Sequence, residues 1–98
     1  MTAPVVFLQR ARKEIDEADD WWRANRASSD AVLEAVARFV ELIGTQPRLG
    51  AAFETARVRG CRRLLLATIG YWVYYRIDGE RVEVLSLWHV RRGRGPGL

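Results

Sequence analysis

Cysteine, histidine and lysine are almost missing from this sequence. Because Cys61 is the only cysteine, the chain excludes an internal disulfide bond and a zinc site made of cysteines. His89 is likewise the only histidine, so a metal site or a catalytic pair built on histidine lacks obvious partners. We therefore expect neither a metal nor a cofactor, and the cysteine count predicts a cytoplasmic protein.

Long apolar runs are missing as well. Only the short run Pro4–Leu8 precedes the first charged residues, so we expect neither a signal peptide nor a membrane-spanning segment. A chain of 98 residues fits one domain, which buries roughly 60 to 68 per cent of the surface that its unfolded form exposes. We assign residues 1–92 to this domain and predict that residues 93–98, rich in glycine, form a flexible tail.

Acidic residues are scarce in the carboxyl-terminal half. Residues 48–98 hold ten of the 16 basic residues but only four of the 12 acidic ones, so this half is strongly basic. Such a charge attracts a polyanion or an acidic protein segment. Every basic residue except Lys13 is an arginine, whose forked guanidinium suits carboxylate and phosphate groups, although a GC-rich genome gives the same bias.

The spacing of apolar residues predicts a strand and then two helices in the first half. Pro4–Leu8 is predicted to be the strand, and residues 9–27 an amphipathic helix. The adjacent Trp21 and Trp22 point about 100° apart on a helix, so Trp22 is predicted to face the sheet and Trp21 to cover the edge of the helical hairpin. The second helix is predicted to start after Ser28 and Ser29, either of which can cap it, and to end at Gly44.

The second half predicts three strands. Residues 44–60 lack a sustained period and are predicted to be a loop, and residues 61–67 begin the next strand. Asp78-Gly79 then joins two runs of β-branched and aromatic residues, which is a strong hairpin signal. We expect an α+β fold in the order β-α-α-β-β-β, an antiparallel sheet with a helical hairpin packed on one face.

The hairpin sorts its side chains onto two faces. If Asp78 and Gly79 form a type I′ turn, Trp72 opposes Leu85, and successive side chains alternate between the faces. The first face is apolar and is predicted to form the core with the helices: Tyr71, Val73, Tyr75, Ile77, Val82 and Val84, with Ile15, Trp22, Val36, Phe39 and Ile43. The second face mixes large apolar and charged residues: Trp72, Tyr74, Arg76, Arg81, Glu83, Leu85, Leu87 and His89.

The second face is predicted to be a binding surface. A solvated face does not ordinarily carry so many large apolar side chains, and exposed apolar patches mark sites of interaction. The alternative is a sheet covered on both sides by the chain's own elements. Two helices are too few to cover two faces, so docking of a partner is the favoured interpretation.

The chain resembles the RelE/ParE superfamily of toxins from bacterial type II toxin-antitoxin pairs. The resemblance covers nearly the whole chain and rests on an ordered set of short stretches: Pro47-Arg48-Leu49-Gly50, Arg62-Arg63, Gly70–Arg76, Asp78-Gly79, Val82–Leu85, His89 and Arg91-Arg92. It implies a fold with the element order given above. Within the superfamily, toxins of the RelE branch cleave messenger RNA in the ribosome.

Several residues typical of the ribonuclease branch are missing here. Trp72 stands where that branch commonly has an arginine, Val90 stands where it often has a tyrosine, and Lys13 is the only lysine. The resemblance is therefore closest to the ParE branch. It implies a non-enzymatic poison that binds DNA gyrase and is neutralised by an acidic ParD-type antitoxin, with DNA contacted only indirectly through the antitoxin.

Three sets of residues are predicted to act in binding. Apolar anchors for the antitoxin are Trp72, Tyr74, Leu85 and Leu87, and partners for its carboxylates are Arg57, Arg59, Arg62 and Arg63. Which of Arg62 and Arg63 faces the groove stays open. Contacts to the target are assigned to His89, Arg91, Arg92 and Arg94, against the alternatives of a packing role for the histidine and a solvated tail for the arginines.

Two other functions are kept beside this one. A RelE-type mRNA endonuclease would use His89, the only catalytic candidate, together with nearby arginines. A chain that has lost its toxicity and only binds its partner is the third hypothesis.

Overall fold

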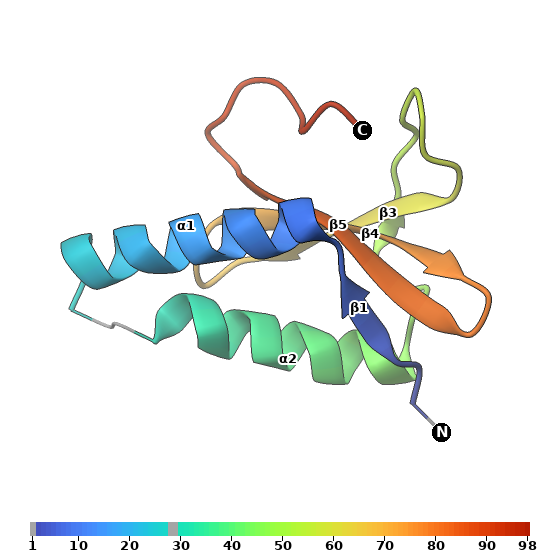
Figure 1. Ribbon diagram of the computed structural model, residues 1–98, viewed down its shortest axis with the longest axis horizontal. Helices are drawn as coiled ribbons and strands as arrows, with labels where there is room; N and C mark the ends of the chain where they lie inside the picture. Colours follow the sequence, from blue (N-terminus) through green and yellow to red (C-terminus); the bar gives the residue numbers. More distant parts are fainter. Residues whose placement is uncertain (1, 28–29) are drawn as a thin grey trace.

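The computed structural model describes residues 2–27 and 30–98 and has two layers, a helical hairpin and a five-stranded sheet (Figure 1). No helix of these residues is long and apolar enough to cross a membrane. The elements follow one another as β1 (Val5–Phe7), α1 (Gln9–Asn25), α2 (Ala31–Thr45), β2 (Ala51–Ala52), β3 (Cys61–Leu66), β4 (Tyr71–Asp78) and β5 (Arg81–His89). The predicted order is thus confirmed, with the two-residue β2 added inside the predicted loop.

Both helices bury one apolar stripe against the sheet. Ala11, Ile15 and Ala18 of α1 are buried, as are Val32, Ala35, Phe39 and Ile43 of α2. The backbone carbonyl of Asp30 accepts from Glu34 N at 2.9 Å, which starts α2. The capping predicted for Ser28 and Ser29 falls outside the described residues.

The sheet is mixed, in the order β1-β5-β4-β3-β2. β1 pairs in parallel with β5, while the other neighbours are antiparallel, so the expectation of a wholly antiparallel sheet was wrong for this strand. β1 ends at Phe7 opposite Val84. Beyond that point Oε1 of Glu14, from α1, accepts from Leu87 N at 3.2 Å and from Ser86 Oγ at 2.7 Å.

The register of the hairpin differs from the predicted one. Asp78 pairs with Arg81, so the loop residues are Gly79 and Glu80, and only Gly79 has a positive φ, of 62°. A type I′ turn needs a positive φ at both positions, whereas glycine at the first is the pattern of type II′. Farther along, an irregularity between Tyr74 and Tyr75 inserts one extra residue in β5, so Trp72 opposes Trp88.

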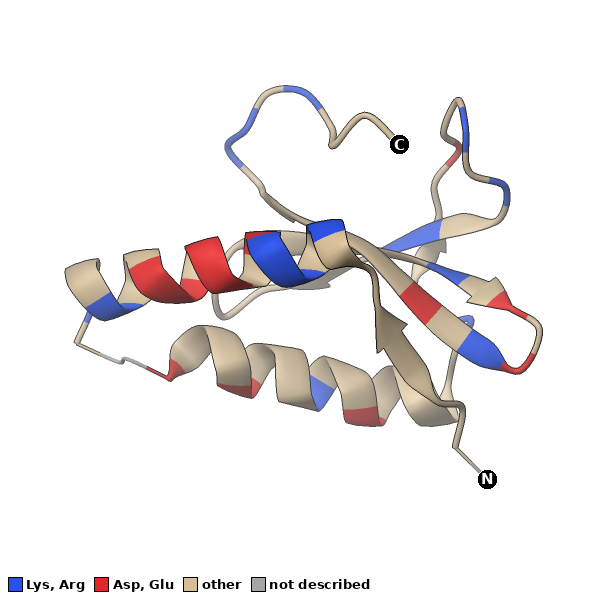
Figure 2. Cartoon of the chain, viewed as in Figure 1, with Lys and Arg blue, Asp and Glu red and all other residues tan. Residues whose placement is uncertain are grey.

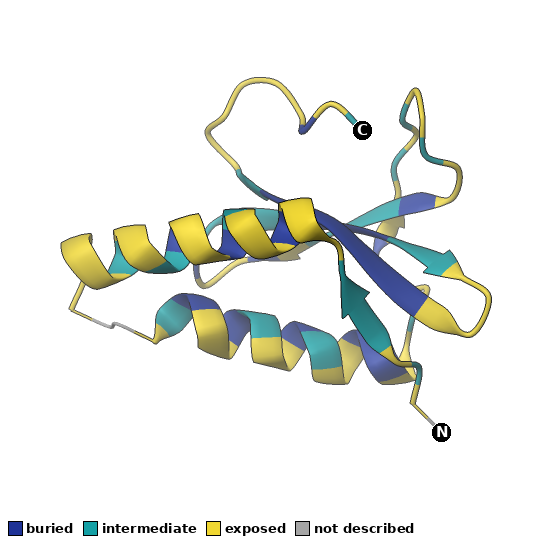
Figure 3. Cartoon of the chain, viewed as in Figure 1, coloured by how far each residue is buried: buried dark blue, intermediate teal, exposed yellow. Residues whose placement is uncertain are grey.

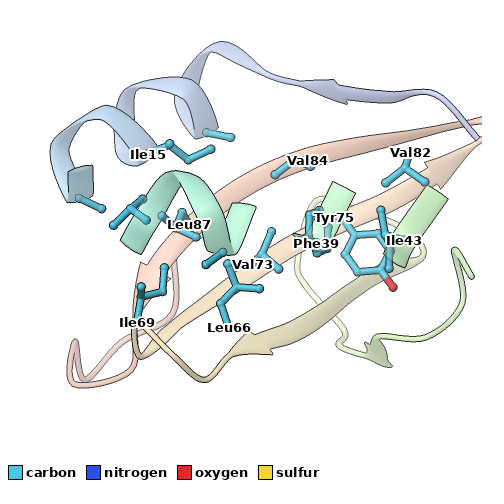
Figure 4. Close-up of a cluster of buried hydrophobic side chains, with 14 residues drawn as sticks. Ile15, Phe39, Ile43, Leu66, Ile69, Val73, Tyr75, Val82, Val84 and Leu87 are labelled. Carbon is cyan, nitrogen blue, oxygen red and sulfur yellow. The ribbon is translucent and has the colours of Figure 1, made fainter. Parts of the chain in front are cut away.

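The core lies between the helices and the first face of the sheet (Figures 3 and 4). It contains most of the side chains predicted for it, including Val73, Tyr75, Val82 and Val84, and Tyr71, Trp22 and Val36 pack at its border. Ile69 and Leu87 are additional members. Leu87 was predicted on the second face, and the extra residue in β5 carries it to the helix side.

Tyr75 ties the segment after α2 to the core. Its hydroxyl donates to the carbonyl of Pro47 at 2.8 Å and accepts from Gly50 N at 2.7 Å. A Cβ at position 50 would lie 2.6 Å from that hydroxyl oxygen, so only glycine fits this approach. The Pro47–Gly50 stretch therefore has a packing role that fixes where β2 begins.

Candidate functional site

The sheet face away from the helices carries a second apolar cluster, here called the outer face. Cys61, Tyr74 and Leu85 are its buried members. Partly buried side chains packed against them complete it: Phe53, Val58, Trp72, Trp88 and Leu98. Trp72, Tyr74 and Leu85 thus lie together as predicted, and none of them packs beneath a helix. Leu87, the fourth predicted anchor, lies in the helix-side core instead.

Arg63 is the arginine that faces this cluster. Its guanidinium carbon lies 3.9 Å from the ring centre of Trp72 and 4.6 Å from that of Phe53. Arg62 instead donates to the carbonyls of Arg48 at 3.1 Å and Gly50 at 2.7 Å, which holds β2 against β3. The planar guanidinium of Arg63 keeps its charge while it stacks, so it stays available to a carboxylate.

Two segments of the chain border and partly cover the outer face. The loop between β2 and β3 presents Arg57 and Arg59, both exposed, at its edge. The tail after β5 lies over the cluster from the other side: Pro96 is buried, its carbonyl accepts from Arg10 Nη2, and Leu98 packs on the cluster. Both segments carry basic residues in Figure 2. The flexibility predicted for residues 93–98 stays a prediction.

The basic residues after β5 separate in the structure. Arg92 stacks over Trp88, with its guanidinium carbon 4.1 Å from the ring centre, so it belongs to the outer face. Arg94 is exposed beside Phe53 and Leu98. Arg91 is exposed, and its backbone N–H donates to Nδ1 of His89 at 3.1 Å.

His89 lies on the helix side, whereas the predicted register put it on the second face. It opposes Tyr71, and the two rings meet edge to face at 4.9 Å. With Trp21, Trp22, Arg26 and Ile69, these residues line a hollow of about 340 Å³ at the end of the helical hairpin, called here the hairpin-end hollow. Among the predicted target-binding residues, His89 lines this hollow and Arg92 stacks on the outer face, and the two also line an adjoining hollow together with Trp21 and Tyr71.

Sequence reasoning missed four members of the outer face: Phe53, Val58, Trp88 and Leu98. The first two lie in a loop without a period, and Leu98 lies in the tail. Trp88 was displaced by the same extra residue in β5 that moved Leu87 and His89. Only Phe53, an aromatic residue in an irregular segment, gave a signal in the sequence.

A charged cluster closes the hairpin end of the outer face. Arg76 Nε lies 2.8 Å from Oε1 of Glu83, and Arg81 Nη2 lies 2.6 Å from its Oε2. The hydrogen bond from Arg76, with a smaller effect of Arg81, holds the pKa of Glu83 below its ordinary value of 4.5, against the opposing effect of burial. Both arginines therefore serve Glu83 and are less available to a partner.

Glu83→Gln is expected to lower the free energy of unfolding at neutral pH, because a neutral amide cannot replace the charge between two guanidinium groups. The folded-state pKa is lowered, so this stabilisation is present above pH 4.5 and disappears as the pH falls through the folded value. Denaturant unfolding of the wild type and of Glu83→Gln at several pH values measures the difference in their free energies of unfolding. This difference should shrink in acid. A difference independent of pH would contradict the role of the ionised Glu83 carboxylate.

The outer face has the composition of a binding surface. Among residues 2–27 and 30–98, no group of three or more His, Cys, Asp or Glu side chains lies in a position to hold a metal ion. Burial raises the pKa of the Cys61 thiol, which keeps it protonated. The outer face presents aromatic side chains with an arginine stacked on them. Aromatic residues and arginine are the residues that usually contribute most of the binding energy in protein interfaces.

A family model described as the ParE toxin of the type II toxin-antitoxin system parDE matches residues 5–93. The chain belongs to the ParE toxin family. A ParE toxin of a ParDE system has a ParD antitoxin as its partner. No curated protein sequence matches this ParE chain significantly.

Solved structures show the same fold. The chromosomal ParDE toxin-antitoxin system from P. aeruginosa matches with a TM-score of 0.64 and 20% identity, covering 92% of this ParE chain and 98% of that chain. A mutant of the E. coli toxin RelE in the free state matches with a TM-score of 0.66 and 20% identity. The match covers 95% of this ParE chain and 88% of the RelE chain. The RelE/ParE fold expected from the sequence is confirmed.

Proposed function

We propose that this ParE toxin inhibits DNA gyrase by binding it, and that a ParD-type antitoxin neutralises the toxin by docking on the outer face. Membership of the ParE family carries the proposal. The chemistry of the outer face supports the docking mode, because it combines apolar anchors with stacked and flanking arginines.

The antitoxin segment that fits this face is acidic and has large apolar side chains at regular intervals. Its apolar residues would pack on Trp72, Tyr74 and Leu85, as in segments that fold on their partner. Its carboxylates would meet Arg63 at the centre and Arg57 at the edge. Because Leu98 already packs on the cluster, the segment contacts the tail or takes its place.

A purified reaction tests the gyrase target directly. Gyrase and supercoiled plasmid, incubated with the toxin and then denatured, are expected to yield more cleaved DNA than without it, and less again when the antitoxin is added first. Unchanged gyrase cleavage together with ribosome-dependent cuts in translated mRNA would identify an endonuclease of the RelE type. Normal growth of cells that express the toxin, with tight antitoxin binding, would identify a chain that has lost toxicity.

A further inference from the structure

The hairpin-end hollow combines exposed aromatic surface with a positive charge. Trp21 is 47% exposed, an unusual state for so large an aromatic side chain, and its ring meets that of Trp22 edge to face at 6.2 Å. Tyr71 and His89 supply the opposite wall. Trp, Tyr and Arg are the residue types that most often anchor a protein interface.

Arg26 supplies the charge of this hollow. Its guanidinium carbon lies 5.4 Å from the ring centre of Trp21 and 5.5 Å from that of Trp22, so the two rings hold it in place. Within the described part of the chain, Arg26 forms no ion pair, and the residues lining the hollow include no carboxylate. A pre-positioned, unpaired guanidinium beside an apolar hollow suits a partner's carboxylate next to an apolar side chain.

The hollow borders the proposed antitoxin surface, because Arg92, which stacks on Trp88, lies beside Trp21, Tyr71 and His89. None of its lining residues belongs to the outer-face cluster. It is built by the end of α1 on one side, and by the β3–β4 turn and the end of β5 on the other (Figure 1). A partner bound here would leave Trp72 and Arg63 free.

The charges around the hollow favour a protein over a nucleic acid. The outward side of α1 is strongly acidic and leads up to Trp21 (Figure 2): Asp16, Glu17, Asp19 and Asp20. A nucleic-acid strand needs several cations along its backbone and would be repelled by this row of carboxylates. A single partner carboxylate directed at Arg26 carries one negative charge instead of many, so it meets much less of this repulsion.

We propose that the hairpin-end hollow is the surface with which this toxin holds its target. The partner is a protein segment of gyrase. It inserts one large apolar side chain between Trp21 and Tyr71, and a neighbouring carboxylate of this segment pairs with Arg26. The inference rests on the proposed function, since it deepens the contact with gyrase.

Trp21→Ala and Arg26→Glu test the inference in the gyrase cleavage reaction. The toxin concentration that gives half-maximal cleavage is expected to rise about 30-fold for each variant, the effect of losing an interface anchor, while antitoxin affinity stays unchanged. Trp21→Phe, which keeps an aromatic ring, should recover part of the loss. Leu33→Ala removes an equally exposed apolar side chain of α2, 44% exposed, and should match the wild type.

The outcomes separate the two proposals. Wild-type activity in either Trp21→Ala or Arg26→Glu would overturn the inference and leave the gyrase target in place. A parallel loss of antitoxin binding would also overturn it, because the hollow would then serve the antitoxin. If the wild-type chain does not raise gyrase cleavage at all, the proposed function fails, and the inference fails with it.

Discussion

Trp72→Glu is expected to fold and to lose about 100-fold or more in affinity for the ParD-type antitoxin, a loss typical of an interface tryptophan. Trp72 is half-buried on the outer face, beneath the guanidinium of Arg63, and no helix covers it. A carboxylate there removes a large apolar contact of the proposed docking surface and engages the arginine that a partner would use. Titration calorimetry with the purified antitoxin measures the loss.

Leu33→Glu is the matched control for this variant. Leu33 is an exposed apolar residue of α2, outside both apolar clusters, so the same charge change there should leave antitoxin affinity unchanged. Circular dichroism shows whether each variant keeps its fold. A folded Trp72→Glu protein that binds antitoxin normally would contradict the docking mode, and an unfolded one would place Trp72 among the residues that hold the fold together.

Gly50→Ala is expected to lower the free energy of unfolding by about 3 kcal/mol, from overpacking and the loss of a buried hydrogen bond. The added methyl would lie 2.6 Å from the Tyr75 hydroxyl and 2.9 Å from the carbonyl oxygen of Arg63. Neither neighbour is the end of a flexible side chain, since Tyr75 is fully buried and the other is backbone. Denaturant unfolding followed by tryptophan fluorescence measures the change.

Gly93→Ala and Tyr75→Phe complete this experiment. A Cβ at position 93 meets nothing within 4 Å, so Gly93→Ala should leave stability unchanged. Tyr75→Phe keeps the ring but leaves the Gly50 N–H and the Pro47 carbonyl without their partner, which costs about 1 to 3 kcal/mol. Equal free energies of unfolding for Gly50→Ala and Gly93→Ala would contradict the prediction. They would show that the close approach of residue 50 to Tyr75 does not fix the start of β2.

The helices and the central hairpin were predictable because they follow strong periods. Helical spacing gave both helices to within two residues at their ends, and alternation placed Tyr75, Val82 and Val84 on the buried face. These residues lie on the predicted face even though the turn is shifted by one residue from its predicted position. Moving the turn from Asp78-Gly79 to Gly79-Glu80 changes the partner of each residue by two, which keeps every side chain on its predicted face.

The extra residue in β5 was not predictable, and it accounts for most errors at the candidate sites. No glycine or proline interrupts Arg81–His89, so nothing in the sequence indicates that alternation stops near Leu85. Beyond that point Leu87 and His89 change sides. The position of Arg63 over Trp72 depends on a different register, the pairing of β3 with β4, which the sequence did not fix, so Arg62 and Arg63 stayed equal choices.

The contact between Glu14 and the end of β5 has a consequence for the toxin before its antitoxin arrives. Past Phe7 the outermost strand would offer a bare amide at Leu87 to any extended chain, which is how sheets grow from one molecule into the next. The Glu14 carboxylate occupies that amide and brings a negative charge to the border. The Glu14 side chain thus keeps this amide from pairing with a strand of a second copy of the chain.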